Sequence, residues 1–183
     1  ELNIIKEEAT TLVSKLQKGL LTAKQVTLAF YKTAAIAHQI ICIISESSSS
    51  QPLKRAEELD THYLKTGATV SLKDQFHVKG NDTTMGYVGW IDTYEGSKDK
   101  KLVHQVNSQI VSELLDQGAI LFCKTILPQT LLLGETINNI IGTTLNPNNR
   151  NLSCGGSSGG EGAFQALRGS LAGWAQTLEG QFE

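Results

Sequence analysis

The sequence predicts an α/β fold in which a mixed β-sheet is covered by helices on both faces. Two short runs of apolar, β-prone residues, 68–72 and 119–123, have the length of buried strands. A segment with helical apolar spacing precedes the second run, and a helix followed by an apolar strand is typical of α/β proteins. The chain has 183 residues, of which 40% are hydrophobic, which suits one domain or a piece of a larger one.

The N-terminal segment predicts two helices. Apolar residues recur at helical spacing over residues 2–18, and Gly19 is suited to end that helix. Thr22 and Gln25 have the form of a capping box, in which each side chain satisfies a backbone amide of the other residue. A second amphipathic helix is therefore expected over residues 22–36.

A serine-rich stretch over residues 45–51 predicts an exposed loop. Pro52 suits the first position of a third helix, expected over residues 52–65 and closed by Gly67. The first predicted strand, 68–72, follows directly. The remaining segments are expected in this order: a long loop over 79–100, a helix over 105–117, the strand over 119–123, a helix over 128–135, an irregular loop over 142–162 and a helix over 161–167.

Composition excludes several classes of partner. The formal net charge is -2 and the basic residues are dispersed, so no nucleic-acid partner is expected. No apolar run approaches the ~18 residues of a membrane span, and the N-terminus lacks the pattern of a signal peptide. The chain has three cysteines, an odd number without metal-ligand spacing: Cys42, Cys123 and Cys154. We therefore expect reduced thiols and no metal site. Reduced thiols are typical of a cytoplasmic protein, so a cytoplasmic location is expected as well.

The segment richest in chemical information is a glycine- and serine-rich loop. It contains Gly155, Gly156, Ser157, Ser158, Gly159 and Gly160. Glycines permit close backbone approach and positive φ, and such a loop before a helix suits an oxyanion or a phosphate. Taken alone, the same residues would equally suit a flexible linker. A phosphate-binding P-loop is disfavoured because no Gly-Lys-Ser/Thr follows.

Lys73 stands at the end of the first predicted strand, followed by Asp74. A lysine at the end of a buried strand is costly unless it has a function or a partner. An exposed lysine at the strand end is the alternative reading.

Together these motifs resemble the amidase-signature family, in particular its fungal acetamidase-like branch. The resemblance extends over about residues 10–170. The matching stretches are Ser71 to Phe76, Asp82 to Trp90, Gly118 to Thr125, Pro128 to Thr130, Gly134 to Asn139 and the glycine- and serine-rich loop.

The resemblance implies a Ser–Ser–Lys triad. Lys73 falls on the catalytic lysine, and Ser157 falls on a bridging serine that lies next to a cis peptide bond in the family. A buried lysine, its pKa lowered from about 10.4, would accept a proton through Ser157 from a nucleophilic serine. Gly155, Gly156, Ser158, Gly159 and Gly160 would form the loop around the substrate and the oxyanion. The expected substrate is a small carboxylic amide, with no metal and no organic cofactor.

The chain departs from the family pattern after residue 170. The nucleophile's register falls on Gln181, which cannot attack a carbonyl. Read from the third base of the Gly173 codon, the degenerate codons for 173–183 permit Val-Gly-Thr-Asp-Ile-Gly-Gly-Ser-Ile-Arg, the family's nucleophile segment. We therefore expect residues 1–170 to be an incomplete N-terminal part of one domain, and residues 171–183 to be a frame-shifted tail. The family's Gly-Pro-Leu-His-Gly-like stretch before the lysine strand is also absent.

Three interpretations remain open. The chain is an amide hydrolase by descent, truncated and inactive alone; or a non-catalytic binding or regulatory fragment; or the product of an error in the gene model. The four histidines are expected to have no catalytic role, whereas Glu135 and Asn139 are expected to brace the glycine- and serine-rich loop. The sequence assigns no oligomeric state.

Overall fold

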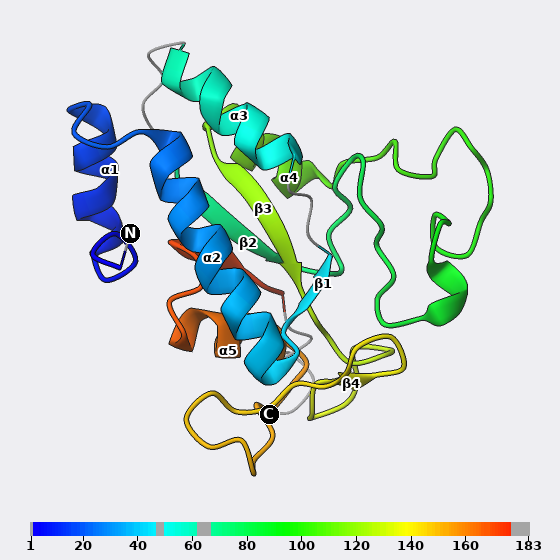
Figure 1. Ribbon diagram of the computed structural model, residues 1–183. Coiled ribbons are helices and arrows are strands. Elements are labelled where there is room, and N and C mark those ends of the chain that lie inside the picture. Colours follow the sequence, from blue (N-terminus) through cyan, green and yellow to red (C-terminus); the bar gives the residue numbers. More distant parts are fainter. Residues whose placement is uncertain (1, 47–49, 62–66, 177–183) are drawn as a thin grey trace.

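A computed structural model describes residues 2–46, 50–61 and 67–176 (Figure 1). Four strands form one sheet in the order β1-β3-β2-β6, in which β2 runs parallel to β3 and β6 while β1 is antiparallel to β3. The sheet is therefore mixed, as predicted. Its strands are β1 (Ile44–Glu46), β2 (Thr69–Lys73), β3 (Ile120–Thr125) and β6 (Ala172–Trp174), and β4 (Ile137–Asn138) pairs separately with β5 (Gly142–Thr143).

Five α-helices surround the sheet. They are α1 (Ala9–Gln17), α2 (Ala23–Ile41), α3 (Ser50–Thr61), α4 (Gln109–Asp116) and α5 (Gly159–Ala166), with a short 3-10 helix, η1 (Val88–Trp90). The helices α2 and α5 lie over one face of the sheet and α4 lies over the other (Figure 1). No helix in the described part of the chain is long and apolar enough to cross a membrane.

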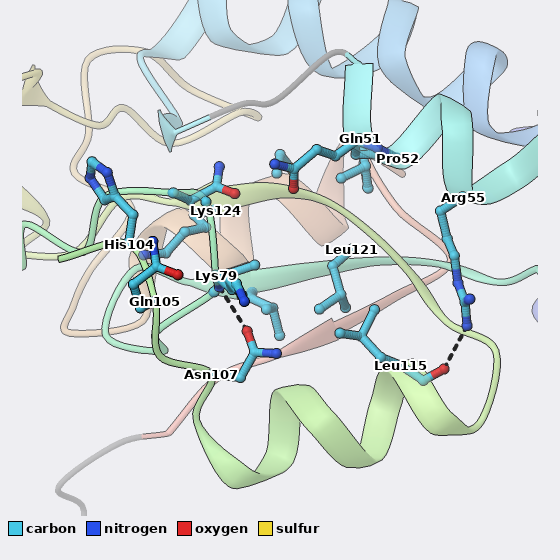
Figure 2. Close-up of a pocket in the computed structure, with 16 residues that line it drawn as sticks. Gln51, Pro52, Arg55, Lys79, His104, Gln105, Asn107, Leu115, Leu121 and Lys124 are labelled. Carbon is cyan, nitrogen blue, oxygen red and sulfur yellow. Dashed lines mark hydrogen bonds between the residues drawn. The ribbon is translucent and has the colours of Figure 1, made fainter. Parts of the chain in front are cut away.

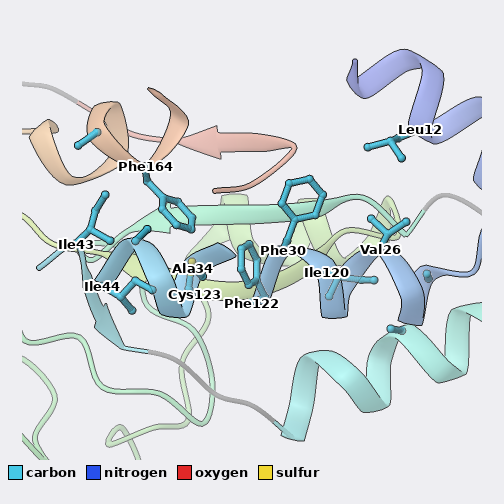
Figure 3. Close-up of a cluster of buried hydrophobic side chains, with 14 of the residues drawn as sticks. Leu12, Val26, Phe30, Ala34, Ile43, Ile44, Ile120, Phe122, Cys123 and Phe164 are labelled. Carbon is cyan, nitrogen blue, oxygen red and sulfur yellow. The ribbon is translucent and has the colours of Figure 1, made fainter. Parts of the chain in front are cut away.

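The larger core lies between the sheet and the helices α2 and α5 (Figure 3). Phe122 of β3 contacts Tyr31 edge-on, with ring centroids 5.4 Å apart, and lies 6.1 Å from the ring of Phe164 in α5. These aromatic contacts fix α5, and the loop that precedes it, against the sheet.

A smaller core covers the opposite face. Val70 and Leu72 of β2 pack there with Val111 of α4. Strand residues alternate between faces, so Ser71 and Lys73 point toward α5 instead. This alternation places Lys73 opposite the glycine- and serine-rich loop.

The first three helices differ from prediction mainly in their ends. The helix expected over 2–18 begins only at Ala9, after turns. The Thr22–Gln25 capping box is present with both hydrogen bonds, but α2 continues to Ile41 and ends at a left-handed Cys42. The expected loop over 45–51 contains part of β1, a pairing that the local sequence does not reveal.

Farther along the chain, one predicted helix is wrong. Residues 128–135 form turns instead, because Thr130 and Leu131 adopt positive φ angles of 74° and 64° that an α-helix cannot contain. The helix expected over 105–117 begins at Gln109, and the one expected from Glu161 begins two residues earlier, at Gly159.

Candidate active site

Lys73, at the end of β2, lies at the centre of the candidate site. Its side chain has no solvent-exposed surface. The Nζ atom donates to Ser157 Oγ at 2.8 Å, to Ser158 Oγ at 2.9 Å and to the carbonyl oxygen of Gln176 at 2.8 Å. Burial excludes the exposed strand-end lysine that the sequence had left open.

The glycine- and serine-rich loop is packed rather than flexible. Its Gly156–Ser157 peptide is cis, and Ser158 is the N-cap residue of α5. A Cβ on Gly159 would lie 2.3 Å from Thr136 Oγ1, and one on Gly160 would lie 2.2 Å from the carbonyl oxygen of Ile126. No other residue type fits such close approaches, so the linker interpretation is wrong.

The residues that support this loop are close in sequence to Glu135 and Asn139, the two that were predicted to support it. A Cβ on Gly156 would meet the backbone of Glu135 at 3.0 Å, so the Glu135 backbone contacts the loop. Thr136 Oγ1 donates to the carbonyl oxygen of Gly155 at 2.7 Å. The expectation for Asn139 is wrong, because its side chain is exposed and directed to Gln129. The loop is therefore held by Thr136 and the main chain.

A buried polar network, which sequence reasoning missed, joins α5 to the sheet. Glu161 is 4% exposed, and its carboxylate accepts from Ser71 Oγ, from Thr125 Oγ1 at 2.8 Å and from Gln165 Nε2 at 2.8 Å. Ser170 Oγ lies 2.7 Å from Ser71 Oγ. Burial raises the pKa of Glu161, against the opposing effect of these three hydrogen bonds. The sequence could have indicated this network, because side chains alternate between the faces of a strand and Ser71 therefore shares a face with Lys73.

A buried ion pair holds the loop that follows β2. Asp74 Oδ1 lies 3.1 Å from Lys124 Nζ, and the two side chains are 2% and 3% exposed. The other Asp74 oxygen, Oδ2, accepts from the Met85 amide at 2.8 Å. Lys124 also donates to Thr83 Oγ1 at 2.7 Å. Asp74 thus orients local backbone, while Lys124 was not identified from the sequence.

One group of side chains has the types that bind metal ions. Ligand atoms of Asp82, Asp92 and His104 lie within 4.8 Å of one another. Asp82 Oδ1, however, is already 2.7 Å from His104 Nε2, so the carboxylate and the imidazole satisfy each other. This group therefore carries no metal assignment.

His38 and His77 lie away from these contacts, whereas Cys154 Sγ donates to the carbonyl oxygen of Gly155 in the loop at 3.5 Å. His38 Nδ1 accepts from the Ile44 amide at 3.2 Å, and His77 stacks on Tyr94 with ring centroids 4.7 Å apart. His62 lies outside the described residues. Cys42, Cys123 and Cys154 form no disulfide in the described part of the chain.

The segment after residue 170 is described only in part. Strand β6 pairs in parallel with β2, and Gln176 places its carbonyl oxygen on Lys73. Gln181, the residue expected at the register of the nucleophile, lies outside the described residues.

Sequence comparison connects this geometry with known enzymes. A profile of the amidase family matches residues 25–176. An acetamidase of Emericella nidulans is 44% identical over 188 residues, and an acetamidase of Aspergillus oryzae is 43% identical over 189 residues. Each alignment covers 98% of this chain but 33% of the relative, so the chain spans about a third of the length of these relatives.

Solved structures agree with the sequence comparison. A fatty acid amide hydrolase superposes with a TM-score of 0.80 at 35% identity, covering 94% of this chain and 30% of the other. A 6-aminohexanoate cyclic dimer hydrolase superposes with a TM-score of 0.77 at 22% identity, covering 91% and 33%, a likeness of fold alone. The α/β fold of this chain is thus part of a larger known fold.

Proposed function

The chain belongs to the amidase family, and on that premise we propose that it carries the lysine base and the serine proton relay of a hydrolase of small carboxylic amides. Lys73 is the base and Ser157 is the relay. The single observation that carries this proposal is the 2.8 Å contact between Lys73 Nζ and Ser157 Oγ on a fully buried lysine.

The surroundings of Lys73 suit a neutral amine. Such an amine has two N–H bonds and one lone pair. The carbonyl oxygen of Gln176 can only accept, and Ser158 Oγ is a second acceptor, so these two contacts use the two N–H bonds. In the neutral form the direction of the 2.8 Å contact with Ser157 would reverse, so that the Ser157 hydroxyl donates to the lone pair of Nζ. Burial disfavours the charged form of a lysine, which supports this assignment.

Amide hydrolysis follows from this arrangement. Lys73 takes the Ser157 proton while Ser157 takes the proton of a nucleophilic serine, which forms a bond to the amide carbon. The proton returns along the same path to the departing amine as the C–N bond breaks, and water then hydrolyses the acyl ester. Backbone amides of the loop 155–160 and of the nucleophile segment would stabilise the oxyanion.

We propose that this polypeptide lacks the nucleophile of that scheme. Gln181 occupies its register, and an amide side chain cannot form the acyl ester. A one-base slip of the reading frame near Gly173 accounts for the residues that follow. A cytoplasmic location completes the proposal, supported by the three free thiols.

Ammonia release from acetamide and benzamide tests the missing nucleophile. The purified chain should release none above the rate of its Lys73→Ala variant. If the chain hydrolyses these amides and the Lys73→Ala variant does not, the assignment of Lys73 as the base stands, but the claim that the chain lacks a nucleophile is wrong.

The nucleotide sequence tests the frame slip. Codons for 173–183 that fail to encode Gly-Thr-Asp-Ile-Gly-Gly-Ser in the shifted frame would exclude it. Codons that encode this segment, followed downstream by the rest of the domain, would support it.

A second candidate function is a non-catalytic binding or regulatory fragment. The observation that favours it is the Gln176 carbonyl oxygen, which occupies Lys73 from the chain's own tail. A monodisperse chain with cooperative unfolding favours this candidate. Aggregation with non-cooperative unfolding would reject it.

A further inference from the structure

The largest cavity described lies on the face of the sheet opposite to Lys73 and Ser157. Its volume is about 530 Å³, within the range of pockets that hold small organic molecules. It lies between α3, α4 and the strands β2 and β3, and neither Lys73 nor Ser157 lines it (Figure 2).

The floor of this cavity is apolar. Leu72 and Leu121 rise from the sheet, Leu115 comes from α4, and Val78 follows β2. Figure 2 shows Leu115 and Leu121 in the middle of the cavity, with polar side chains gathered toward one end. A ligand here needs an apolar body, because these side chains offer it no hydrogen bonds.

The charge around the cavity has one sign. Four basic residues line it and no aspartate or glutamate does: Arg55, Lys79, His104 and Lys124. Two of them are already paired, since Lys124 lies 3.1 Å from Asp74 and His104 lies 2.7 Å from Asp82. The charge of Lys124 is therefore largely neutralised for a ligand, and the His104 ring is occupied by Asp82.

Lys79 remains as the available cation at the polar end. Its side chain forms no hydrogen bond or ion pair with the residues that the structure describes. Its backbone amide donates to Asn107 Oδ1 at 2.7 Å, which directs the Asn107 amide group beside it (Figure 2). The Asn107 Nδ2 is then a further donor among the residues that line this cavity.

Arg55 closes the far end. Its Nη2 donates to the carbonyl oxygen of Leu115 at 2.8 Å, which fixes the guanidinium on α4 (Figure 2). The apolar floor therefore lies between the hydrogen-bonded guanidinium of Arg55 and the exposed ammonium group of Lys79. A single negative charge at the Lys79 end, with an apolar chain running toward Arg55, matches this distribution.

We propose that this cavity binds a small organic monocarboxylate with an apolar body, the carboxylate at Lys79 and Asn107 and the body on Leu72, Leu115 and Leu121. A polyanion such as a phosphate ester fits poorly, because one unpaired cation at that end cannot neutralise it. An uncharged apolar molecule would leave Lys79 without a counter-charge. The site is separate from the proposed hydrolytic one and does not depend on it.

Calorimetric titration of the full chain with octanoate tests the proposal. Octanoate should bind saturably. Octanol should bind about tenfold more weakly because it lacks the carboxylate, and acetate should give no measurable signal because it lacks the apolar chain. Equal binding of octanoate and octanol would overturn the role of charge, and absence of saturable octanoate binding would overturn the site.

Matched variants locate the contact. Lys79→Met should weaken octanoate about tenfold while leaving octanol unchanged, since it removes one charge-assisted contact and keeps the side-chain length. Lys98→Met, an exposed lysine that does not line the cavity, is the control and should change neither. An equal loss in both variants would contradict the proposal.

Methyl NMR of the same chain fixes the position independently of affinity. Octanoate should shift the methyl signals of Val78, Leu115 and Leu121, and leave that of Leu12 in the opposite core unchanged. Shifts confined to the other face, or octanoate binding lost on Ser157→Ala but kept on Lys79→Met, would place the anion elsewhere and overturn the proposal.

Discussion

The two faces of the sheet differ in what holds them together. Toward α5, strand β2 presents Ser71 and Lys73, both fully buried and hydrogen-bonded to the loop or helix above. Toward α4 it presents the apolar Val70 and Leu72, and Leu72 lines a cavity of about 530 Å³. The α5 face is held by specific hydrogen bonds and by close approach of the backbone. The α4 face is held by contact between apolar side chains and leaves a cavity beside them.

This difference follows from the cost of burial. A buried polar group without a hydrogen bond costs about 1–3 kcal/mol in protein mutational data, so the hydrogen bonds of Ser71 and Lys73 matter for stability, although Thr69 Oγ1 on the same face is buried without a partner. Apolar side chains have no such requirement and lose mainly contact area when neighbours are missing. We therefore expect the α5 face to be intolerant of small changes and the α4 face to be more permissive.

The largest effect is expected at the closest backbone approach of the α5 face. In Gly160→Ala the added Cβ would lie 2.2 Å from the carbonyl oxygen of Ile126, so α5 must move. We expect the free energy of unfolding to fall by about 3 kcal/mol, measured by urea denaturation.

Gly162→Ala on the same helix is the matched control. A Cβ there meets nothing within 4 Å, and alanine is favoured in a helix, so a gain of about 0.5–1 kcal/mol is expected. Equal losses in the two variants would show that helix propensity, rather than close approach, governs this face.

A smaller effect is expected from truncation on the α4 face. Leu72→Ala removes a fully buried side chain, but one that already borders open space and so has fewer neighbours to lose. The loss of unfolding free energy should be about 2 kcal/mol, at the low end for such truncations. A loss of about 5 kcal/mol would mean that this face is packed as tightly as the other.

The smallest effect is a pH dependence that we expect from Glu161 on the α5 face. Burial raises the pKa of Glu161 above its ordinary value of 4.5, so the folded chain binds this proton more tightly than the unfolded chain does. Its stability contribution is present below pH 4.5 and is lost as pH rises through the raised value.

Glu161→Gln keeps the shape and removes the titration. The free energy of unfolding of the parent should therefore fall relative to this variant as pH rises from 4.5 toward neutrality. A difference between the two proteins that stays constant across this range would show that Glu161 does not titrate differently on folding.

The same contrast explains what the sequence could predict. The capping box at Thr22 depends on local pattern and is confirmed, as is the order of the helices and strands that correspond to predicted ones: α1, α2, α3, β2, α4, β3 and α5. The meeting of Lys73 with the glycine- and serine-rich loop was expected only because several motifs occur in the order of a known family. Their catalytic roles and the frame slip stay predictions.

Contacts between distant segments could not be predicted. Strand β1 is defined by its pairing with β3, and the Asp74–Lys124 ion pair joins the ends of two different strands. The helix expected over 128–135 failed because positive φ at Thr130 and Leu131 outweighs a run of helix-forming leucines. In each case tertiary contacts override local preference.

The most direct test of the central claim is the activity of a chimaera in which residues 1–173 of this chain replace the matching third of the Emericella nidulans acetamidase. We predict that it hydrolyses acetamide, and that Lys73→Ala lowers kcat by roughly 10³ or more while the exposed-lysine control Lys98→Ala stays within about twofold of the parent. A Lys73→Ala chimaera whose kcat also stays within about twofold of the parent would contradict the assignment of Lys73 as the base.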